Sequence, residues 1–412
     1  MKIGFCIAAF VIGCLFAVLV RSSSEVAPAE GADTTPTQLA AELDAATVTA
    51  PPMTLKVVKH SYGAFEASPV SRYVCSNENG LSFEVIDWGA TIVAVNTPDR
   101  EGRFGNVVLN CEGLEGYQAC QSFFGSTIGR FSDRIAYGSF SLDGHQYSLS
   151  LNDGKNHLNG GSKGFDKQVW ATEEIVDADA VGVRMSMTSP DGDQGYPGAC
   201  QVSVTYLLNN DDQLSVQFEA QTDAATPINL ASQVFWNLNG DATGSVATHQ
   251  LRIDADQRLV LDNQQIPTGE TKSVSETRFD FRQPITIGHF DLVISSPVSL
   301  NNPLTLENCF KGFNDNFVLN SQTGVLAHAA TLSSPSSGRK VEVWTTQPGL
   351  LLDSANLLDG QPSSGGLQKH SGISLRTQHH PDSPNQSEFP STVIQPGDKY
   401  DQKTVYSFSI AD

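Results

Sequence analysis

The 412-residue sequence is poor in basic residues and has no run of them: 25 Lys and Arg stand against 45 Asp and Glu, which gives a formal net charge of −20. A protein of that charge repels a nucleic acid backbone, so we expect no nucleic acid partner. Cys-x-x-Cys and His-rich spacings are absent, and so is a Gly-rich phosphate loop leading into a helix. We therefore expect neither a metal site nor a cofactor.

Beyond residue 21 the sequence also lacks a long helical pattern, because no run of more than about two turns keeps a 3.6-residue period. It has short alternating or β-branched runs instead, such as Leu81–Val85, Gln201–Leu207, Leu214–Phe218 and Lys340–Thr345. Turn clusters separate them, among them Asp143-Gly144 and 209–212. This pattern is typical of hairpins and predicts an all-β fold, a large antiparallel β-sandwich, for which 39% hydrophobic residues supply the core.

One long apolar run, Ile3–Val20, lies near the start of the chain between Lys2 and Arg21. Residues 1–21 are therefore predicted to be a signal peptide or an N-terminal anchor, and both alternatives export the rest of the chain. We expect a secreted or periplasmic protein, with this segment as its one route of membrane attachment. Residues 22–52, rich in Ala, Thr and Pro, are predicted to form a flexible tether, and residues 53–412 a single folded domain.

Four stretches of the folded part share their pattern with one known family. The first is FFGSTIGRFSDRIAYGSFSLDGHQYSLSLNDGKNHLNGGSKGFDKQVW at 123–170. The others are SPDGDQGYPG at 189–198, TPINLASQVFWNL at 226–238 followed by IPTGE at 266–270, and RTQHHPDSPN at 376–385. In this order, and over nearly the whole folded part, they resemble the aldose 1-epimerase (galactose mutarotase) family.

The resemblance implies a galactose mutarotase-like supersandwich with a sugar-binding cleft, so a carbohydrate is the expected ligand. Members of the family interconvert the α and β anomers of a free aldose through its open-chain form. The reaction needs one group that removes the proton of the C1 hydroxyl and another that protonates the ring oxygen. A carboxylate and an imidazole suit these tasks, because both exchange protons near neutral pH.

Both positions that carry the proton transfer in the family are changed in this sequence. The family base is a Glu in the string Glu-Thr-Gln-His, which here reads Arg376-Thr377-Gln378-His379. The family acid is a His in Asn-Leu-Thr-Asn-His, which here spans 229–233 and ends in Gln233. Because Arg stays protonated and an amide has no titratable proton, neither residue transfers a proton near neutral pH.

The family's sugar-binding positions are changed less severely. The motif His-Leu-His-Gly-Gly has Asn159 in its third place, and Phe-Asp-His-Asn-Phe has Asn314 in its second. The pair Asn-Arg reads Asp133-Arg134. The resemblance therefore places substrate binding at Asp133, Arg134, Asn159 and Asn314. The neighbouring Asp315 is expected on the opposite face of its strand unless a bulge intervenes.

Three functions stay open at this point. A sugar-binding protein with impaired epimerase chemistry follows from Arg376 and Gln233, since the amides at the changed positions still bind hydroxyls. An active aldose 1-epimerase would need other acid and base groups, for which the candidates are His157, His379 and Asp315. A structural or interaction module with a vestigial cleft is the third possibility, in which Arg376 pairs with a carboxylate such as Asp133.

Overall fold

The computed structural model describes residues 54–289 and 310–411 of this chain. The predicted leader, 1–21, and the predicted tether, 22–52, lie outside the described residues, so both stay predictions. In these two ranges no helix has the length and apolar character needed to cross a membrane. Within the same ranges no group of His, Cys, Asp and Glu side chains could hold a metal ion.

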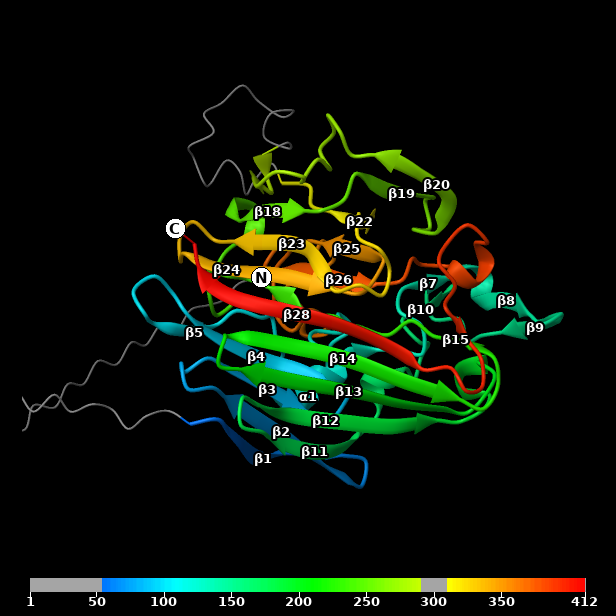
Figure 1. The fold of residues 1–412 in the computed structure, drawn as a ribbon, viewed down its shortest axis with the longest axis horizontal. Coiled ribbons are helices and arrows are strands. Elements are labelled where there is room, and N and C mark those ends of the chain that lie inside the picture. Colours follow the sequence, from blue (N-terminus) through cyan, green and yellow to red (C-terminus); the bar gives the residue numbers. More distant parts are fainter. Residues whose placement is uncertain (1–53, 290–309, 412) are drawn as a thin grey trace, which may run out of the picture. The chain divides into compact units, whose positions relative to one another are not determined.

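Antiparallel sheets dominate the described part of the chain, as the sequence predicted (Figure 1). A five-stranded sheet follows the chain order of β1 (Lys56–Phe65), β2 (Ser68–Ser76), β3 (Ser82–Ile86), β4 (Thr91–Pro98) and β5 (Phe104–Asn106). A nine-stranded sheet has the order β11 (Ala171–Val176), β12 (Ala180–Ser189), β13 (Cys200–Asn209), β14 (Gln213–Thr222), β28 (Tyr400–Ile410), β24 (Arg339–Thr345), β23 (Ala327–Ser333), β18 (Gln250–Ile253) and β21 (Ile285–Thr286).

A six-stranded sheet has the order β17 (Phe235–Trp236), β26 (Ile373–Gln378), β25 (Gly349–Asp353), β22 (Asn314–Val318), β19 (Gln257–Leu261) and β20 (Pro267–Ser273). Within residues 54–289 and 310–411, four two-stranded pairs complete the strands: β7 (Arg134–Ile135) with β10 (His157–Leu158), β6 (Thr127–Ile128) with β16 (Ala231–Ser232), β8 (Ser139–Leu142) with β9 (His145–Ser148), and β15 (Thr226–Pro227) with β27 (Val393–Ile394). The helices of the described part of the chain are short: α1 (Gly113–Ala119) and six 3-10 turns, at Ala136–Gly138, Phe165–Lys167, Asp193–Gly195, Val246–Thr248, Pro362–Ser364 and Ser383–Asn385.

The alternating runs in the sequence form strands because one side of each faces the core. On β13, Val204 and Tyr206 are buried, and on β14 their direct partners Phe218 and Val216 are buried too. Such cross-strand pairs hold an antiparallel ladder in register. The predicted turn Asp143-Gly144 closes the β8–β9 hairpin with positive φ at both residues, 50° and 78°, as a tight two-residue hairpin loop requires.

One apolar core joins the three large sheets. It contains Phe83 of β3, Tyr206 of β13 and Leu352 of β25. On β25, Leu350 and Leu352 belong to this core, whereas Leu351 does not. Because successive side chains of a strand point to opposite faces, residues 351 and 353 project from the far side of the six-stranded sheet. That far side is where the polar residues of the sheet gather.

Candidate functional site

A cavity of about 650 Å³ lies over the polar face of the six-stranded sheet. Pockets that hold small ligands typically measure about 300–1,000 Å³, so this cavity is large enough for a sugar ring. The cavity is lined by all six residues predicted for catalysis or substrate binding, which are Asp133, Arg134, Asn159, Gln233, Asn314 and Arg376. The fold thus brings together positions that are far apart in the sequence, while their roles toward a ligand stay predictions.

Strand register explains how the floor of the cavity is built. Leu351 on β25 lies directly opposite Arg376 on β26, and Asp353 lies opposite both Asn314 on β22 and Ser374 on β26. Residues that face each other across a ladder share one face of the sheet. The floor therefore presents a guanidinium, a carboxylate and an amide on neighbouring strands.

Two turns bring the remaining residues to this floor. Arg134 and Leu158 pair between β7 and β10, so Asp133 just before β7 and Asn159 just after β10 are neighbours. Both have positive φ, 69° and 50°, a conformation that Asp and Asn tolerate better than most residues. Gln233 follows β16 and is fixed by backbone hydrogen bonds to residues 125 and 126.

Arg376 is 3% exposed, and its guanidinium contacts three of the other predicted residues. Nη1 donates to Gln233 Oε1 and, at 3.4 Å, to Asn159 Oδ1, while Nη2 lies 3.2 Å from Asp133 Oδ2. Burial lowers the pKa of this guanidinium, and the nearby carboxylates of Asp133 and Asp353 raise it. The two residues predicted to stand at the family's base and acid positions are therefore hydrogen-bonded to each other, and Asp133 balances the charge of the cation.

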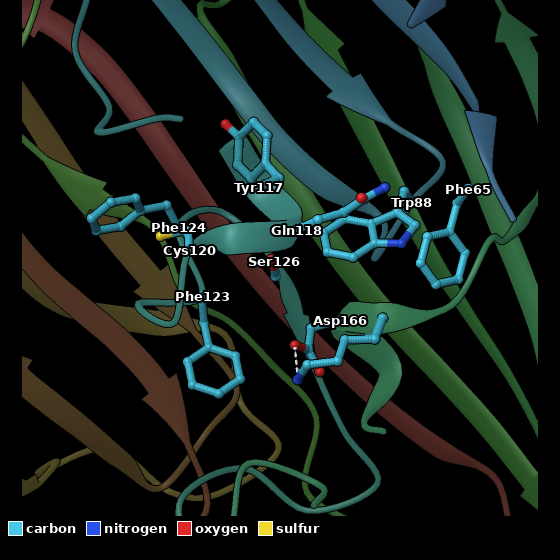
Figure 2. Close-up of a pocket in the computed structure, with 10 residues that line it drawn as sticks. Phe65, Trp88, Tyr117, Gln118, Cys120, Phe123, Phe124, Ser126 and Asp166 are labelled. Atoms are coloured by element: carbon cyan, nitrogen blue, oxygen red, sulfur yellow. Dashed lines mark hydrogen bonds and ion pairs between the residues drawn. The ribbon is translucent and has the colours of Figure 1, made fainter. Parts of the chain in front are cut away.

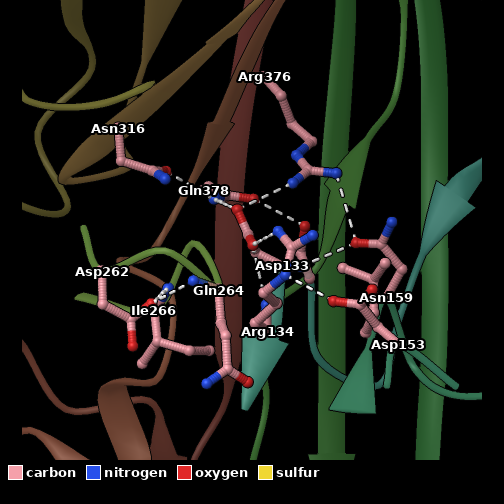
Figure 3. A network of polar contacts seen from close by, with 12 residues as sticks. Asp133, Arg134, Asp153, Asn159, Asp262, Gln264, Ile266, Asn316, Arg376 and Gln378 are labelled. Carbon is pink, nitrogen blue, oxygen red and sulfur yellow. Dashed lines mark hydrogen bonds and ion pairs between the residues drawn. The ribbon is translucent and has the colours of Figure 1, made fainter. Parts of the chain in front are cut away.

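Asp133 is the anionic centre of the network (Figure 3). Its Oδ1 accepts the backbone N–H of Arg134 at 2.9 Å, and its Oδ2 accepts Gln378 Nε2 at 3.1 Å in addition to Arg376. The backbone N–H of Asp133 donates to Asn159 Oδ1 at 2.9 Å, and Arg134 Nε donates to Asp153 Oδ2 at 2.7 Å. The predicted pairing of Arg376 with Asp133 is present, as part of a chain of alternating charges.

Asp315 does not take the place of the family carboxylate. The β22–β25 register runs without interruption, with Asn314 opposite Asp353 and Asp315 opposite Leu352. Asp315 therefore lies on the opposite face from the cavity floor, as the strand period predicted in the absence of a bulge. Its carboxylate lies 3.4 Å from Arg258 Nη1.

The two histidines considered as alternative catalysts do not line the cavity. His157 has both ring nitrogens engaged, Nδ1 with Ser150 O at 2.7 Å and Nε2 with the Tyr196 hydroxyl at 2.9 Å. His379 Nδ1 lies 2.8 Å from Gln347 Oε1. Burial lowers the pKa of each imidazole to about 4, so both are neutral near pH 7. They act as hydrogen-bonding parts of the framework.

Sequence reasoning missed one titratable group on the cavity floor, Asp353 at the end of β25. Its Oδ1 accepts the backbone N–H of Ala355 at 2.9 Å. Burial raises the pKa of this carboxyl to about 6, against the opposing effects of the Ala355 N–H and of Arg376. The signal in the sequence was a single acidic residue that ends the apolar run 350–352.

Another cavity, drawn in Figure 2, has a volume of about 140 Å³. Its walls include Phe65, Trp88 and Phe123, and Phe123 also lines the large cavity. Lys167 Nζ lies 2.7 Å from Asp166 Oδ2 and 5.2 Å from the centre of the Phe123 ring. The large cavity is the candidate sugar site because all six predicted residues line it, whereas none of them lines this smaller one.

The antiparallel sandwich with a polar cavity over one sheet defines a protein of the galactose mutarotase-like class. A solved galactose 1-epimerase from Lactobacillus acidophilus NCFM superposes with a TM-score of 0.74 at 26% identity, covering 87% of this chain and 100% of that one. An aldose epimerase homologue from C. elegans superposes with a TM-score of 0.70 at 25% identity, covering 87% of this chain and 100% of that one.

Sequence comparison narrows the class to one family. A family model described as aldose 1-epimerase matches residues 71–407. The chain is 40% identical over 335 residues to a galactose mutarotase from Bos taurus, covering 80% of this chain and 92% of that protein. It is 33% identical over 347 residues to an aldose 1-epimerase from Escherichia coli strain K12, covering 83% and 96% of the two chains. This chain belongs to the aldose 1-epimerase family.

Proposed function

We propose that this protein binds a carbohydrate, an aldohexose or a sugar-bearing ligand, in the large cavity and that its aldose 1-epimerase chemistry is impaired. The observation that carries the proposal is the direct hydrogen bond between Arg376 and Gln233. In the family resemblance these are the two proton-transfer positions. Here one is a permanent cation and the other an amide, and the cation donates a hydrogen bond to the amide oxygen.

The chemistry of the cavity supports binding without proton transfer. General acid and base groups typically contribute about 10²–10⁴-fold each to a reaction. Without both of them, ring opening is left close to its spontaneous rate in water. Asn159 and Asn314 still present amides to the cavity, and amides donate and accept hydrogen bonds with hydroxyls.

The binding half of the proposal is tested by calorimetric titration with D-galactose and D-glucose. We expect saturable heat for at least one sugar, and we expect Asn314→Leu to weaken that binding about fivefold, since one lost hydrogen bond is worth about 1 kcal/mol. Gln217→Leu is the matched control, because Gln217 lies on β14 with its amide bound to Asp401. If neither sugar binds, the result would favour the third function, a structural module with a vestigial cleft.

The catalytic half is tested by polarimetry on freshly dissolved α-D-galactose and α-D-glucose. We expect the optical rotation to decay at the buffer rate in the presence of catalytic amounts of protein. The 40% identity to a protein named galactose mutarotase favours the second candidate, an active aldose 1-epimerase. Decay much faster than in buffer would establish that candidate and refute the impairment.

We also propose that the chain is exported through its N-terminal apolar run, Ile3–Val20. N-terminal sequencing of protein recovered from a native host decides between a cleaved signal peptide and an anchor. A mature start after residue 21 in the soluble fraction indicates cleavage, and an intact start in the membrane fraction indicates an anchor. An intact start in soluble cytoplasm would refute export.

A further inference from the structure

Asp353 stands apart from the other charged groups of the large cavity. The guanidinium of Arg376 and the carboxylate of Asp133 are committed to their ion pair with each other. At the rim, hydrogen bonds led by that of the Ser364 hydroxyl lower the pKa of Asp359. Asp353, by contrast, is a carboxyl on the cavity floor whose pKa is raised to about 6 by burial.

The position of Asp353 makes it accessible to a ligand on the floor. It ends β25 on the same face as Arg376, with Asn314 directly opposite on β22. One carboxylate oxygen is held by the Ala355 N–H at 2.9 Å, which fixes the orientation of the group. A carboxylate oriented in this way, beside an amide, accepts hydrogen bonds from adjacent hydroxyls of a pyranose.

The charged and titratable groups around Asp353 come from every element packed against β25. In the described part of the chain, those that line the cavity are Arg376 on β26, Asp133 and Arg134 on the opposite wall, and Asp359 at the rim. Two more lie on neighbouring elements: Asp315 on the far face of β22, and His370, whose Nε2 lies 3.2 Å from Asn356 Oδ1. Burial opposes the charged form of Asp353, and Arg376 favours it. Hydroxyls donated by a sugar would favour it further.

We infer that Asp353 is the hydroxyl acceptor that holds the sugar in this cavity, so that a neutral aldose binds best when this carboxyl is ionised. The inference rests on the proposed sugar binding. It assigns Asp353 to binding because ring opening needs two groups, one that takes the proton of the C1 hydroxyl and one that gives a proton to the ring oxygen. A single carboxylate beside a permanent cation supplies only the first.

The wild-type protein provides the first test, a calorimetric titration with D-galactose between pH 5 and pH 7.5. With a pKa of about 6 for the free carboxyl, we expect binding to be roughly tenfold weaker at pH 5 than at pH 7.5. At pH 6 the titration should release protons, seen as a dependence of the heat on the ionisation enthalpy of the buffer. Binding with the same affinity and no proton release across this range would overturn the inference.

Asp353→Asn assigns the effect to this residue, because the amide oxygen can still accept the Ala355 N–H. We expect weaker galactose binding that no longer changes with pH. Asp315→Asn is the matched control, since burial raises the pKa of that carboxyl as well but it lies on the opposite face; it should keep the wild-type pH dependence. An unchanged pH dependence in Asp353→Asn would refute the assignment.

These outcomes separate the inference from the proposed function on which it rests. If no sugar binds the wild-type protein at any pH, the proposed function itself fails. If galactose binds and only the pH dependence or the proton release is missing, sugar binding stands and the role of Asp353 fails. Near-UV circular dichroism of Asp353→Asn shows whether its weaker binding reflects a lost acceptor or a lost fold.

Discussion

Two buried arginines in this protein, Arg130 and Arg376, are 1% and 3% exposed and yet have opposite surroundings. The Arg130 guanidinium donates to neutral groups, which are the backbone carbonyls of Ser189, Pro190, Pro197 and Gly198 and the hydroxyls of Ser189 and Thr226. It lies 5.5 Å from the centre of the Tyr196 ring and does not line the large cavity. Arg130 therefore links the segments 189–190 and 197–198 by hydrogen bonds.

Arg376 instead faces the cavity and is balanced by a carboxylate, Asp133. Its partners are side chains, which substitution can replace, whereas the carbonyls around Arg130 belong to the backbone and cannot be removed. The comparison shows that burial alone does not mark a ligand site. The cavity beside the charge, and partners that belong to other cavity-lining residues, distinguish Arg376 from Arg130.

The largest effect is expected when proton-transfer groups are introduced into the cavity around Arg376. The triple variant D133N/Q233H/R376E supplies a base and an acid and removes the carboxylate that would otherwise repel the new one. We expect mutarotation of α-D-galactose to accelerate by at least about 10²-fold over the wild type, measured by polarimetry.

The double variant Q233H/R376E is the control for this prediction. It keeps Asp133, so two carboxylates share one small site and one of them is held protonated. We expect the double variant to be clearly slower than the triple variant at pH 7. Equal rates would mean that the charge of Asp133 does not control this site.

The next effect concerns Arg130. Replacing it in Arg130→Met leaves several buried carbonyls without a donor, and we expect the free energy of unfolding to fall by about 3–5 kcal/mol. Urea unfolding followed by tryptophan fluorescence measures the change. Arg103→Met, whose side chain is 74% exposed, should leave the midpoint close to that of the wild type. A loss for Arg130→Met as small as that of the control would contradict the structural role.

A smaller net effect is expected when both members of the Arg376 pair are replaced together. Either Asp133→Asn or Arg376→Met alone leaves a buried charge uncompensated and should cost about 3–5 kcal/mol, whereas the combination D133N/R376M should cost under about 2 kcal/mol. A double-mutant cycle from urea unfolding gives the coupling. Additive losses would show that the two side chains stabilise the fold independently.

The last effect is a dependence of stability on pH, and it belongs to His157, which is hydrogen-bonded to Tyr196 on the Arg130 side. Its folded pKa of about 4 lies below the value of about 6.5 in an unfolded chain, because burial disfavours the charged ring. Between these values the unfolded state binds more protons, so the stability from this residue rises with pH and is lost as pH falls.

The expected slope in that window is at most about 1.4 kcal/mol per pH unit. It is measured as the difference in unfolding free energy between wild type and His157→Gln at several pH values from 4 to 7. The wild type should lose stability relative to the variant toward pH 4. A constant difference over the whole range would show that His157 keeps an ordinary pKa in the folded protein.

Much of the fold follows from local patterns in the sequence. The run at 201–207 became β13, and Asp143-Gly144 became a hairpin turn, because strand alternation and turn chemistry are properties of neighbouring residues. The assembly of the site does not follow from such patterns. Gln233 and Arg376 are 143 residues apart, and only the family resemblance placed them at one site before the structure did.

The place of Asp353 on the cavity floor could not be predicted from the sequence. Three leucines precede it, and an unbroken apolar run does not reveal which of its two faces meets a cavity. That face is set by the register between β25 and β26, where Leu351 lies opposite Arg376. The pairing of Asp133 with Arg376 was predictable from their opposite charges. The hydrogen bond from Arg376 to Gln233 was not, because it depends on the backbone hydrogen bonds that fix Gln233 just after β16.

The ion pair between Asp133 and Arg376 also constrains how such a cavity can evolve. If Arg376 is replaced by a carboxylate first, the new carboxylate lies beside that of Asp133. If Asp133 is replaced first, the buried guanidinium of Arg376 loses its counter-ion, at a cost of about 3–5 kcal/mol. A domain with about 5–15 kcal/mol of total stability loses much of it in either intermediate. A change from Arg376 to a carboxylate therefore passes through a less stable intermediate, whichever of the two residues changes first.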